Sequence, residues 1–432
     1  MTTTTRLTLL QRTATALGGY QGSITSGTAT TIVAEGLVGA LSDDDLNDWL
    51  LIMPDAATAA DQIRIVTDHA GSTGTLTFAT RADTTYTSET YFLLPKNSWT
   101  LQECRQAVSK ALRETKRTYR YIVPSRDDET EYALVDLTWL RNALDVDGVF
   151  WRACPNFIFN ADFSHWHSGT TSAPDGWTLA GSGGTIARST TFASRGAYVA
   201  QVTRSGTDVT LTYDLPYQLA KQLIDDLAPV AIKVRCSTAT ASIVRVGIND
   251  GNDTTWSSYH SGDGEPEDLT ATRTLTAAAS RVRLTLSVDT SDGVGSFDFA
   301  PMVEGTSVDD ALWNGGESAY AMDEVKHEIR NIGNGVPVLE LASARNRGGQ
   351  FVVWTRRPFA DLTTDSASTE APSDVIEAKV IYELAMLRKP NQSDDRMAWL
   401  RGHYGGEYAR LANGLIDKPI PRAQRQFVLR GA

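Results

Sequence analysis

The clearest pattern along the chain is an alternation of apolar and polar residues with period two, between Asn156 and Gly305. The apolar members of its five strongest runs are Val209/Leu211/Tyr213, Val230/Ile232/Val234/Cys236, Val244/Val246/Ile248, Val282/Leu284/Leu286/Val288 and Phe297/Phe299. Period two is typical of antiparallel strands that have one face in the core and the other in water. The block therefore predicts an all-β sandwich.

Helical spacing of apolar residues precedes this block. A helix is predicted to begin at Ser98 or Thr100, either of which can cap it, and to run to about Tyr121. Pro124 follows and would end it. The apolar positions that define its buried face are Leu101, Cys104, Val108, Leu112 and Tyr119.

Two more helices are predicted after the block. The first begins at an Asp374 cap, runs to about Arg388 and is ended by Pro390. The second covers residues 394–413. Because the loop between them is short, we expect an antiparallel helical hairpin.

The remaining segments favour short strands and turns. Residues 1–20 predict one short helix, and alternation around Ile63/Ile65 and around Leu76/Phe78 predicts a small β-rich subdomain. Residues 336–341 and 349–354 predict the two strands of a hairpin. Together these patterns predict an α+β fold with a discontinuous host domain, residues 1–153 and 311–432, and an inserted sandwich, residues 154–310.

Composition narrows the class of protein. The 432 residues are 41% hydrophobic and 21% charged, which is ordinary for a globular chain. The absence of an 18-residue apolar run predicts no membrane-spanning helix and no membrane partner. Three distant cysteines predict no disulfide framework and synthesis in a reducing cytoplasm. The net charge of −12 argues against nucleic-acid coating, and suits a wall past which DNA slides without sticking.

Motifs for catalysis are missing, so the sequence predicts a protein that is not an enzyme and needs no cofactor. Neither a Walker A motif nor GxGxxG, HExxH or GxSxG occurs. His165 and His167 share a strand face but have no evident third metal ligand. The run 43–45 of three aspartates favours a polar turn, and GINDGNDTTW favours a hairpin tip before a calcium loop.

Two basic segments are candidate partner-binding surfaces. The outer face of the first predicted helix is rich in cations, and either it is a solvated face or it docks on an acidic neighbour. The tail DKPIPRAQRQFVLRGA is either disordered or ordered on a partner. The candidate residues are Arg113, Lys116, Arg117, Arg120, Lys418, Arg422, Arg425, Phe427, Leu429 and Arg430.

The β block resembles the jelly rolls of carbohydrate-binding modules. The elements that carry this resemblance are NFIFNADFSHW, PDGWTLAG, ASRGAYVAQV and GSFDFAPMVEG. The resemblance implies that Trp177 packs in the core and that Asp298 is a weak calcium candidate. Trp166, Trp256 and Tyr259 are candidate glycan platforms, because sugar rings stack on exposed aromatic faces; the alternative is that these aromatics pack internally.

The two flanks resemble head-to-tail adaptor (connector, or neck) proteins of tailed bacteriophages. The segments are LQECRQAVSKALRETKR, the later LEL…FVVWTRRPFADLTTD, APSDVIEAKVIYELAML and the basic tail. The resemblance implies a virion protein in the neck that forms a homo-oligomeric, dodecameric ring beneath the portal protein. Its partners would be the portal, further neck or tail proteins, and passing DNA bound without sequence specificity.

Other functions remain open from the sequence. One is a tail or baseplate structural protein whose jelly roll binds host glycans. Another is a carbohydrate-binding protein that accompanies an enzyme outside any virion, and the last is a hydrolase. The adaptor hypothesis also predicts that the inserted jelly roll lies on the outside of the ring, where added mass clashes with nothing.

Overall fold

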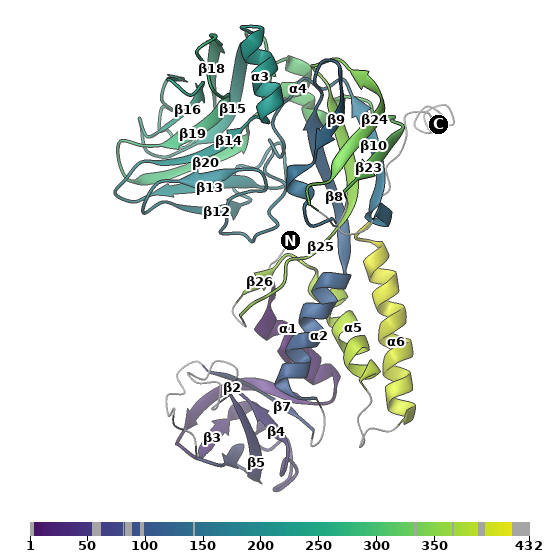
Figure 1. Ribbon diagram of the computed structural model, residues 1–432. Coiled ribbons are helices and arrows are strands. Elements are labelled where there is room, and N and C mark those ends of the chain that lie inside the picture. Colours follow the sequence, from purple (N-terminus) through teal and green to yellow (C-terminus); the bar gives the residue numbers. More distant parts are fainter. Residues whose placement is uncertain are drawn as a thin grey trace, which may run out of the picture. The chain divides into compact units, whose positions relative to one another are not determined.

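The computed structural model describes residues 4–53, 62–80, 82, 89–95, 99–140, 143–331, 335–364, 367–387 and 394–416. They form two compact units (Figure 1). Unit 1 comprises the described parts of Met1–Arg117 and Pro358–Asp417, and unit 2 comprises those of Thr118–Arg357. None of the described helices is both long and apolar enough to cross a membrane. The three cysteines are buried and unpaired.

A closed six-stranded barrel forms the β part of unit 1. Its strands follow the order β2-β3-β6-β5-β4-β7 around the barrel. Their bounds are β2 Tyr20–Gly27, β3 Thr31–Ala34, β4 Leu50–Ile52, β5 Ile63–Ala70, β6 Thr75–Phe78 and β7 Thr90–Leu94. The predicted alternation around Leu76 and Phe78 is confirmed, since both side chains are buried. Ile63 and Ile65 face outward instead, while Val66 enters the core.

Four helices form the rest of unit 1 and are built from the two ends of the chain (Figure 1). They are α1 Arg6–Ala16, α2 Leu101–Glu114, α5 Ser373–Met386 and α6 Asp394–Asn413, and strands β1 Thr4–Thr5 and β26 Ser368–Thr369 pair beside them. One hydrophobic cluster contains Leu10 of α1, Leu112 of α2 and Val380 of α5. The first and last parts of the chain therefore share a core.

Two details of the predicted helices are wrong. The first helix, capped by a Thr100–Glu103 capping box, ends at Glu114, and strand β8 (Lys116–Pro124) follows it. The run of Thr, Tyr, Ile and Val over this stretch favours a strand, and β25 supplies its partner. Helix α5 begins after Pro372 without a side-chain cap, so that Asp374 lies in its first turn.

An ion-pair network joins α2 to α5. Lys110 Nζ lies 2.5 Å from Glu383 Oε2, and Lys379 Nζ lies 2.7 Å from both Glu114 Oε2 and Glu383 Oε1. Burial opposes ionisation of Glu383, but the hydrogen bonds and charges of the two lysines outweigh it and lower the pKa of this carboxyl. The network thus fixes the register between helices from opposite ends of the chain.

Unit 2 contains the predicted sandwich as two antiparallel sheets that pack face to face (Figure 1). One sheet has the order β11-β14-β19-β16-β17; the other has β12-β13-β20-β15-β18, with β21 also paired to β15. The strands are β11 Thr178–Ala180, β12 Thr185–Ser189, β13 Val199–Arg204, β14 Val209–Asp214, β15 Pro229–Ser237, β16 Val244–Asn249, β17 Thr254–Trp256, β18 Glu267–Thr274, β19 Arg283–Val288, β20 Gly293–Phe299 and β21 Met302–Glu304. Helices α3 (Tyr217–Asp225) and α4 (Asp310–Gly315) accompany them.

The period-two runs of this sandwich are confirmed as strands with a buried face. Val209, Leu211 and Tyr213 of β14 are buried opposite Val288, Leu286 and Leu284 of β19. Such cross-strand apolar pairs are the main source of sheet stability. The chain is thus rich in β-structure with a jelly-roll sandwich and a few helices, as expected.

A second group of strands in unit 2 comes from both flanks of the sandwich. One sheet has the order β22-β10-β25-β8 and the other β23-β24-β9. Their bounds are β9 Glu129–Ala133, β10 Val146–Arg152, β22 Asp323–Glu324, β23 His327–Arg330, β24 Val338–Arg345 and β25 Gln350–Pro358. Buried residues of these strands, such as Tyr132 and Phe351, belong to the same hydrophobic cluster as the jelly roll. Segment 154–310 therefore shares a compact unit with neighbouring strands.

The predicted hairpin of residues 336–341 and 349–354 is wrong, although both strands exist. Strand β24 pairs with β23 and β9, whereas β25 pairs with β10. The chain passes from one sheet to the other between them. Long-range pairing with β9 and β10, which both precede the jelly roll in the chain, replaces the predicted local hairpin.

Candidate functional site

The predicted basic surfaces are only partly described. Lys418, Arg422, Arg425, Phe427, Leu429 and Arg430 lie outside the described residues. Of the other candidates, Arg113 is exposed in the last turn of α2, while Lys116, Arg117 and Arg120 lie on β8. They therefore do not form the single helix face that the sequence predicts.

Two of these arginines have partners inside their own unit. Arg117 Nη1 donates to Glu370 Oε2 at 2.8 Å, and its guanidinium lies 5.0 Å from the centre of the Phe359 ring. The Arg120 guanidinium lies 4.5 Å from the centre of the Trp354 ring. Both contacts hold the cations against the protein, which limits what they offer to a partner.

The candidate glycan platforms differ in exposure. Trp166 is 1% exposed and its Nε1 donates to the carbonyl of Phe163, so its assignment as an exposed platform is wrong. Because its indole ring packs in the core, neither face of the ring is accessible to a sugar. Trp177 is buried, as predicted, and its Nε1 donates to Asn160 O at 3.2 Å.

Trp256 and Tyr259 are half-buried, and the Arg245 cation lies over one face of each ring. The Arg245 guanidinium lies 4.3 Å from the Trp256 ring centre and 4.8 Å from that of Tyr259. Asp289 holds this arrangement: its Oδ2 lies 2.8 Å from Arg245 Nε, and its Oδ1 accepts from Tyr259 Oη at 2.9 Å. The ring faces that meet Arg245 are therefore unavailable to a sugar.

The Asp298 carboxylate accepts hydrogen bonds from the loop that contains Ser194. It accepts from the Ser194 amide at 3.1 Å and from the Ser194 hydroxyl, and also from the Arg195 amide at 3.4 Å. Over the described part of the chain, no group of three or more His, Cys, Asp and Glu residues is arranged to hold a metal ion. These contacts explain the buried carboxylate as an anchor for the loop that contains Ser194.

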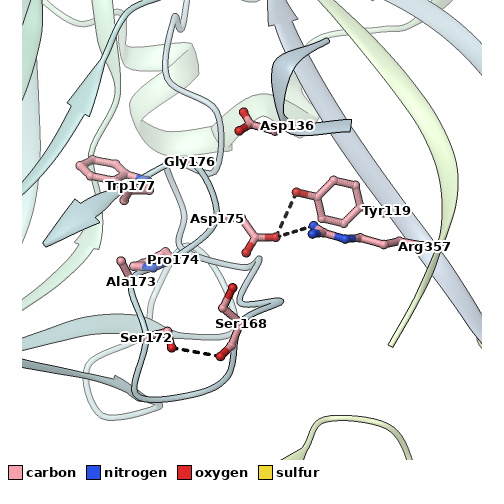
Figure 2. A pocket seen from close by; sticks show the side chains of 10 residues that line it. All are labelled: Tyr119, Asp136, Ser168, Ser172, Ala173, Pro174, Asp175, Gly176, Trp177 and Arg357. Atoms are coloured by element: carbon pink, nitrogen blue, oxygen red, sulfur yellow. Dashed lines mark hydrogen bonds and ion pairs between the residues drawn. The ribbon is translucent and has the colours of Figure 1, made fainter. Parts of the chain in front are cut away.

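A polar pocket of about 330 Å³ lies in unit 2, where the loop over 168–177 meets strands β8 and β25 (Figure 2). Tyr119 comes from β8, Arg357 from β25 and Asp136 from the 3-10 turn Val135–Leu137. The complete lining is Tyr119, Asp136, Ser168, Ser172, Ala173, Pro174, Asp175, Gly176, Trp177 and Arg357. The volume is at the lower end of the range for small-molecule sites.

Three donors fix Asp175 in the pocket, and Figure 2 shows two of them, Tyr119 and Arg357. Its Oδ2 accepts from Tyr119 Oη and from Arg357 Nη1, both at 3.0 Å, and its Oδ1 accepts from the His167 amide at 2.8 Å. Both charged side chains of the Asp175–Arg357 pair are about nine-tenths buried. Because three donors satisfy Asp175, its charge is compensated within the protein.

The turn that carries Asp175 depends on the glycine after it. Gly176 adopts φ +84°, which other residues rarely adopt, and a Cβ there would come within 3.0 Å of the Phe159 ring. The Trp177 amide closes the turn by donating to Pro174 O at 2.9 Å. The sequence Pro-Asp-Gly-Trp therefore sets the direction of the Asp175 side chain.

Asp136 is the second carboxylate and is less completely bonded. One of its oxygens accepts from Tyr121 Oη at 3.1 Å, and the described residues provide no donor for the other. Although Asp136 is an exposed residue, the protein around its carboxyl partly desolvates it. This burial raises the pKa of Asp136, with the nearby Asp175 charge adding to the effect.

Two buried N–H groups behind the pocket wall lack an acceptor among the described residues. They are Trp139 Nε1 and Arg357 Nε. The Arg357 guanidinium contacts the rings of both Tyr119 and Trp139, 4.7 and 5.1 Å from their centres, and these two rings meet each other edge to face. Stacking thus positions Arg357 for Asp175 at the cost of an unmet hydrogen bond.

The side chains that line the pocket are mainly hydrogen-bonding groups. No cysteine, lysine or histidine is among the described residues that line it, and Tyr119 is committed to Asp175. Burial, followed by the charge of Asp175, raises the pKa of the Tyr119 phenol well above its usual value, so the group remains protonated. The accessible chemistry is hydrogen bonding to Asp136 and to serine hydroxyls.

No protein-family model matches this chain, and no curated protein matches it. Solved structures with similar parts exist. A carbohydrate-binding module, TmCBM61, in complex with β-1,4-galactotriose is 14% identical, with 35% of this chain and 99% of that chain covered and a TM-score of 0.26. The CBM22-1 xylan-binding domain from Paenibacillus barcinonensis Xyn10C is 15% identical, with 38% and 97% covered and a TM-score of 0.26.

A third similar structure is the enzymatically active domain of tailspike protein 4 from bacteriophage CBA120. It is 10% identical, and the match covers 35% of this chain but 22% of that chain, with a TM-score of 0.27. Carbohydrate-binding modules are thus among the structural neighbours, as the jelly-roll resemblance predicts. At these scores the neighbours carry no argument about function, and they do not bear on the adaptor resemblance.

The sequence indicates few of the pocket residues. Asp175 and Trp177 belong to the Pro-Asp-Gly-Trp element, which indicates the fold but no role for the carboxylate. Helical spacing assigns Tyr119 to the buried face of a helix, and Arg357 lies far away from it in the chain. Pairing of β8 with β25 brings Tyr119 and Arg357 together, and no local sequence pattern predicts this pairing.

Proposed function

We propose that this chain is a structural virion protein of a tailed bacteriophage. Its copies form the head-to-tail adaptor ring that docks on the portal and lines part of the DNA conduit. The jelly roll decorates the outside of this ring. The protein resides in the neck of the virion, after synthesis in the host cytoplasm.

The observation that carries this proposal is the single helical core built by the two ends of the chain. Leu112 of α2 and Ile376 and Val380 of α5 are fully buried in one cluster. Trp99 Nε1 adds a buried hydrogen bond, 2.8 Å long, to Leu384 O on α5. The adaptor hypothesis requires such a core, because it assigns the two flanks of the jelly roll, residues 1–153 and 311–432, to one discontinuous domain.

Helix α6 supports the proposal by leaving most of its surface open. Although α6 has 20 residues, Met397 and Leu400 are its only buried side chains among those described. Trp399 is 59% exposed and stacks on His403, with ring centres 4.9 Å apart and planes 8° apart. A large exposed aromatic on an open helix face is typical of a protein–protein contact.

A ring places one further demand on the subunit. Each copy needs two different surfaces that fit one another, so that a head-to-tail contact closes on itself. In our proposal the open face of α6 is one of these surfaces. The net charge of −12 then suits a conduit, because like charge keeps DNA phosphates from adhering to its wall.

The glycan-binding alternative has less support at the predicted platforms. Trp166 lies in the core, and Arg245 occupies one face of the Trp256 ring and one face of the Tyr259 ring. A tail or baseplate protein that binds host glycans through these three residues would need the faces of their rings exposed. We therefore favour the adaptor proposal over this alternative.

Replacing Trp399 with glutamate tests the proposal. The Trp399→Glu chain should remain folded by circular dichroism but lose the ring that the unmodified chain forms with the portal in negative-stain images. The matched control is Tyr217→Glu, which places the same charge at a 74% exposed aromatic of unit 2. If Trp399→Glu forms rings as well as the unmodified chain does, α6 is not part of the contact between subunits. If the unmodified chain forms no ring, the proposal is wrong.

A further inference from the structure

We propose that, before it meets the portal, the chain pairs with a second copy of itself through the open face of α6. The two helices run antiparallel, and a twofold axis crosses each of them between Gly402 and His403. The pair covers the surface that we assign to the ring, so a paired chain cannot close into a ring. This regulatory meaning rests on the proposed function, whereas the pair itself does not.

The open face of α6 is one continuous side of the helix. Residues on this side recur at three- and four-residue spacing, which keeps them in line along a helix. All of them are exposed: Asp395, Trp399, Gly402, His403, Gly406, Arg410 and Asn413. Met397 and Leu400 are buried against the rest of unit 1 on the other side of α6.

Two glycines on the open face are not explained by packing within the subunit. A Cβ at Gly402 or Gly406 would meet nothing within 4 Å, whereas a Cβ at Gly405 would meet the Tyr382 ring at 3.0 Å. Glycine inside a helix is less stable than alanine, so its presence needs a reason. Gly402 and Gly406 leave open space on the same side of the helix as Trp399.

A second copy of α6 fits this space when the two helices are antiparallel. A residue that precedes the axis by some number of positions then faces the residue that follows it by the same number. Trp399 of one copy therefore faces Gly406 of the second copy, and the contact occurs twice. The 59% exposed Trp399 ring thus fills the space that a missing side chain leaves.

Charge selects the same arrangement. The antiparallel register sets Asp395 of one copy against Arg410 of the second, again twice. Arg410 is 69% exposed, and its own Glu407 lies 3.4 Å away without covering it. A parallel pair in register would instead set Asp395 against Asp395 and Arg410 against Arg410. Opposite charges therefore favour the antiparallel pair, and like charges oppose the parallel one.

The pair should be weak enough to open when the portal is present. A contact made by one helix from each copy is smaller than the interface of a stable complex. We therefore expect a dissociation constant on the order of 10–100 μM.

Sedimentation velocity of the full-length chain, at concentrations below and above this constant and without portal, measures the pair directly. The test variants are Asp395→Arg and Arg410→Asp, each of which sets like charges against each other twice. The combined variant, Asp395→Arg with Arg410→Asp, restores opposite charges in the same register. The matched control is Asp253→Arg, at a 79% exposed carboxylate of unit 2.

We expect the unmodified chain and Asp253→Arg to form dimers with similar dissociation constants. Each single α6 variant should raise the constant about tenfold or more, and the combined variant should return it to within about threefold of the original. A chain that stays monomeric throughout overturns the inference. So does a combined variant that dimerises no better than the single ones.

A second measurement does not depend on charge. Because the three natural cysteines are buried, Gly402→Cys adds an accessible thiol beside the proposed axis. Mild oxidation should link this variant into covalent dimers about tenfold faster than Tyr217→Cys, at a 74% exposed site of unit 2, since a disulfide needs its two Cβ atoms within about 4.5 Å. Equal rates would contradict the pair. Neither experiment contains portal, so a missing pair leaves the ring proposal standing, and a missing ring leaves the pair standing.

Discussion

Replacing Trp99 with phenylalanine should loosen helices from both ends of the chain at once. Trp99 is 1% exposed, and its Nε1 donates to Leu384 O at 2.8 Å. Phenylalanine keeps an aromatic ring at this place but removes the N–H and part of the buried ring. Because Leu384 lies on α5, the damage should extend across the core shared by the two ends.

The expected loss follows from two contributions. The smaller ring removes roughly 40 Å² of buried apolar surface, worth about 1 kcal/mol at 25 cal/mol per Å². The lost hydrogen bond is worth about 1 kcal/mol, since Leu384 O still accepts from the Leu387 amide at 3.1 Å and is not left bare. The total of about 2 kcal/mol corresponds to a roughly 30-fold larger equilibrium population of the opened core.

Hydrogen exchange followed by mass spectrometry localises this loss better than a melting curve does, because a chain with two units need not unfold in one step. Amides of α2 (Leu101–Glu114) and α5 (Ser373–Met386) should both exchange about 30-fold faster in Trp99→Phe. Trp399→Phe, at a 59% exposed tryptophan of the same unit, should match the unmodified chain. Faster exchange in α2 with unchanged exchange in α5 would refute the shared core.

Three further predictions concern stability. Gly405→Ala should destabilise the α5–α6 pair by about 1–3 kcal/mol in thermal unfolding, because its Cβ would lie 3.0 Å from the Tyr382 ring. The control is Gly406→Ala, which should be neutral or stabilising because a Cβ there meets nothing within 4 Å. Equal losses of stability in the two variants would contradict this packing. The lowered pKa of Glu383, which its two lysines cause against the effect of burial, stabilises unit 1 above the usual value of 4.5. That contribution should disappear as pH falls through the lowered pKa, and Glu383→Gln should remove this part of the pH dependence in urea titrations; an unchanged dependence would refute the assignment. Asp298→Asn should lower the melting temperature while EDTA leaves the unmodified chain unaffected, and a fall caused by EDTA would instead indicate a metal.

Much of the fold is local in origin and could be predicted. The period-two runs of the sandwich have one buried face, as Val209 and Leu211 show, and this pattern needs no knowledge of partners. The second C-terminal helix likewise has the predicted bounds, Asp394–Asn413. Where one periodicity covers a whole element, the sequence and the structure agree.

Errors arose where a distant partner decides the local structure. Residues after Glu114 carry cations at helical spacing, but Tyr119 and Tyr121 enter strand β8 because β25 lies beside it. For the same reason β24 and β25 do not form a hairpin. The candidate site was missed because Tyr119 and Arg357 meet only through this pairing, and a single sequence contains no signal for it.

Negative-stain electron microscopy of the purified chain mixed with the portal of the same phage tests the central proposal most directly. Our account predicts closed rings of this chain seated on the portal, with an open lumen along the common axis. Single subunits that stay apart from the portal at micromolar concentrations of both proteins would contradict it.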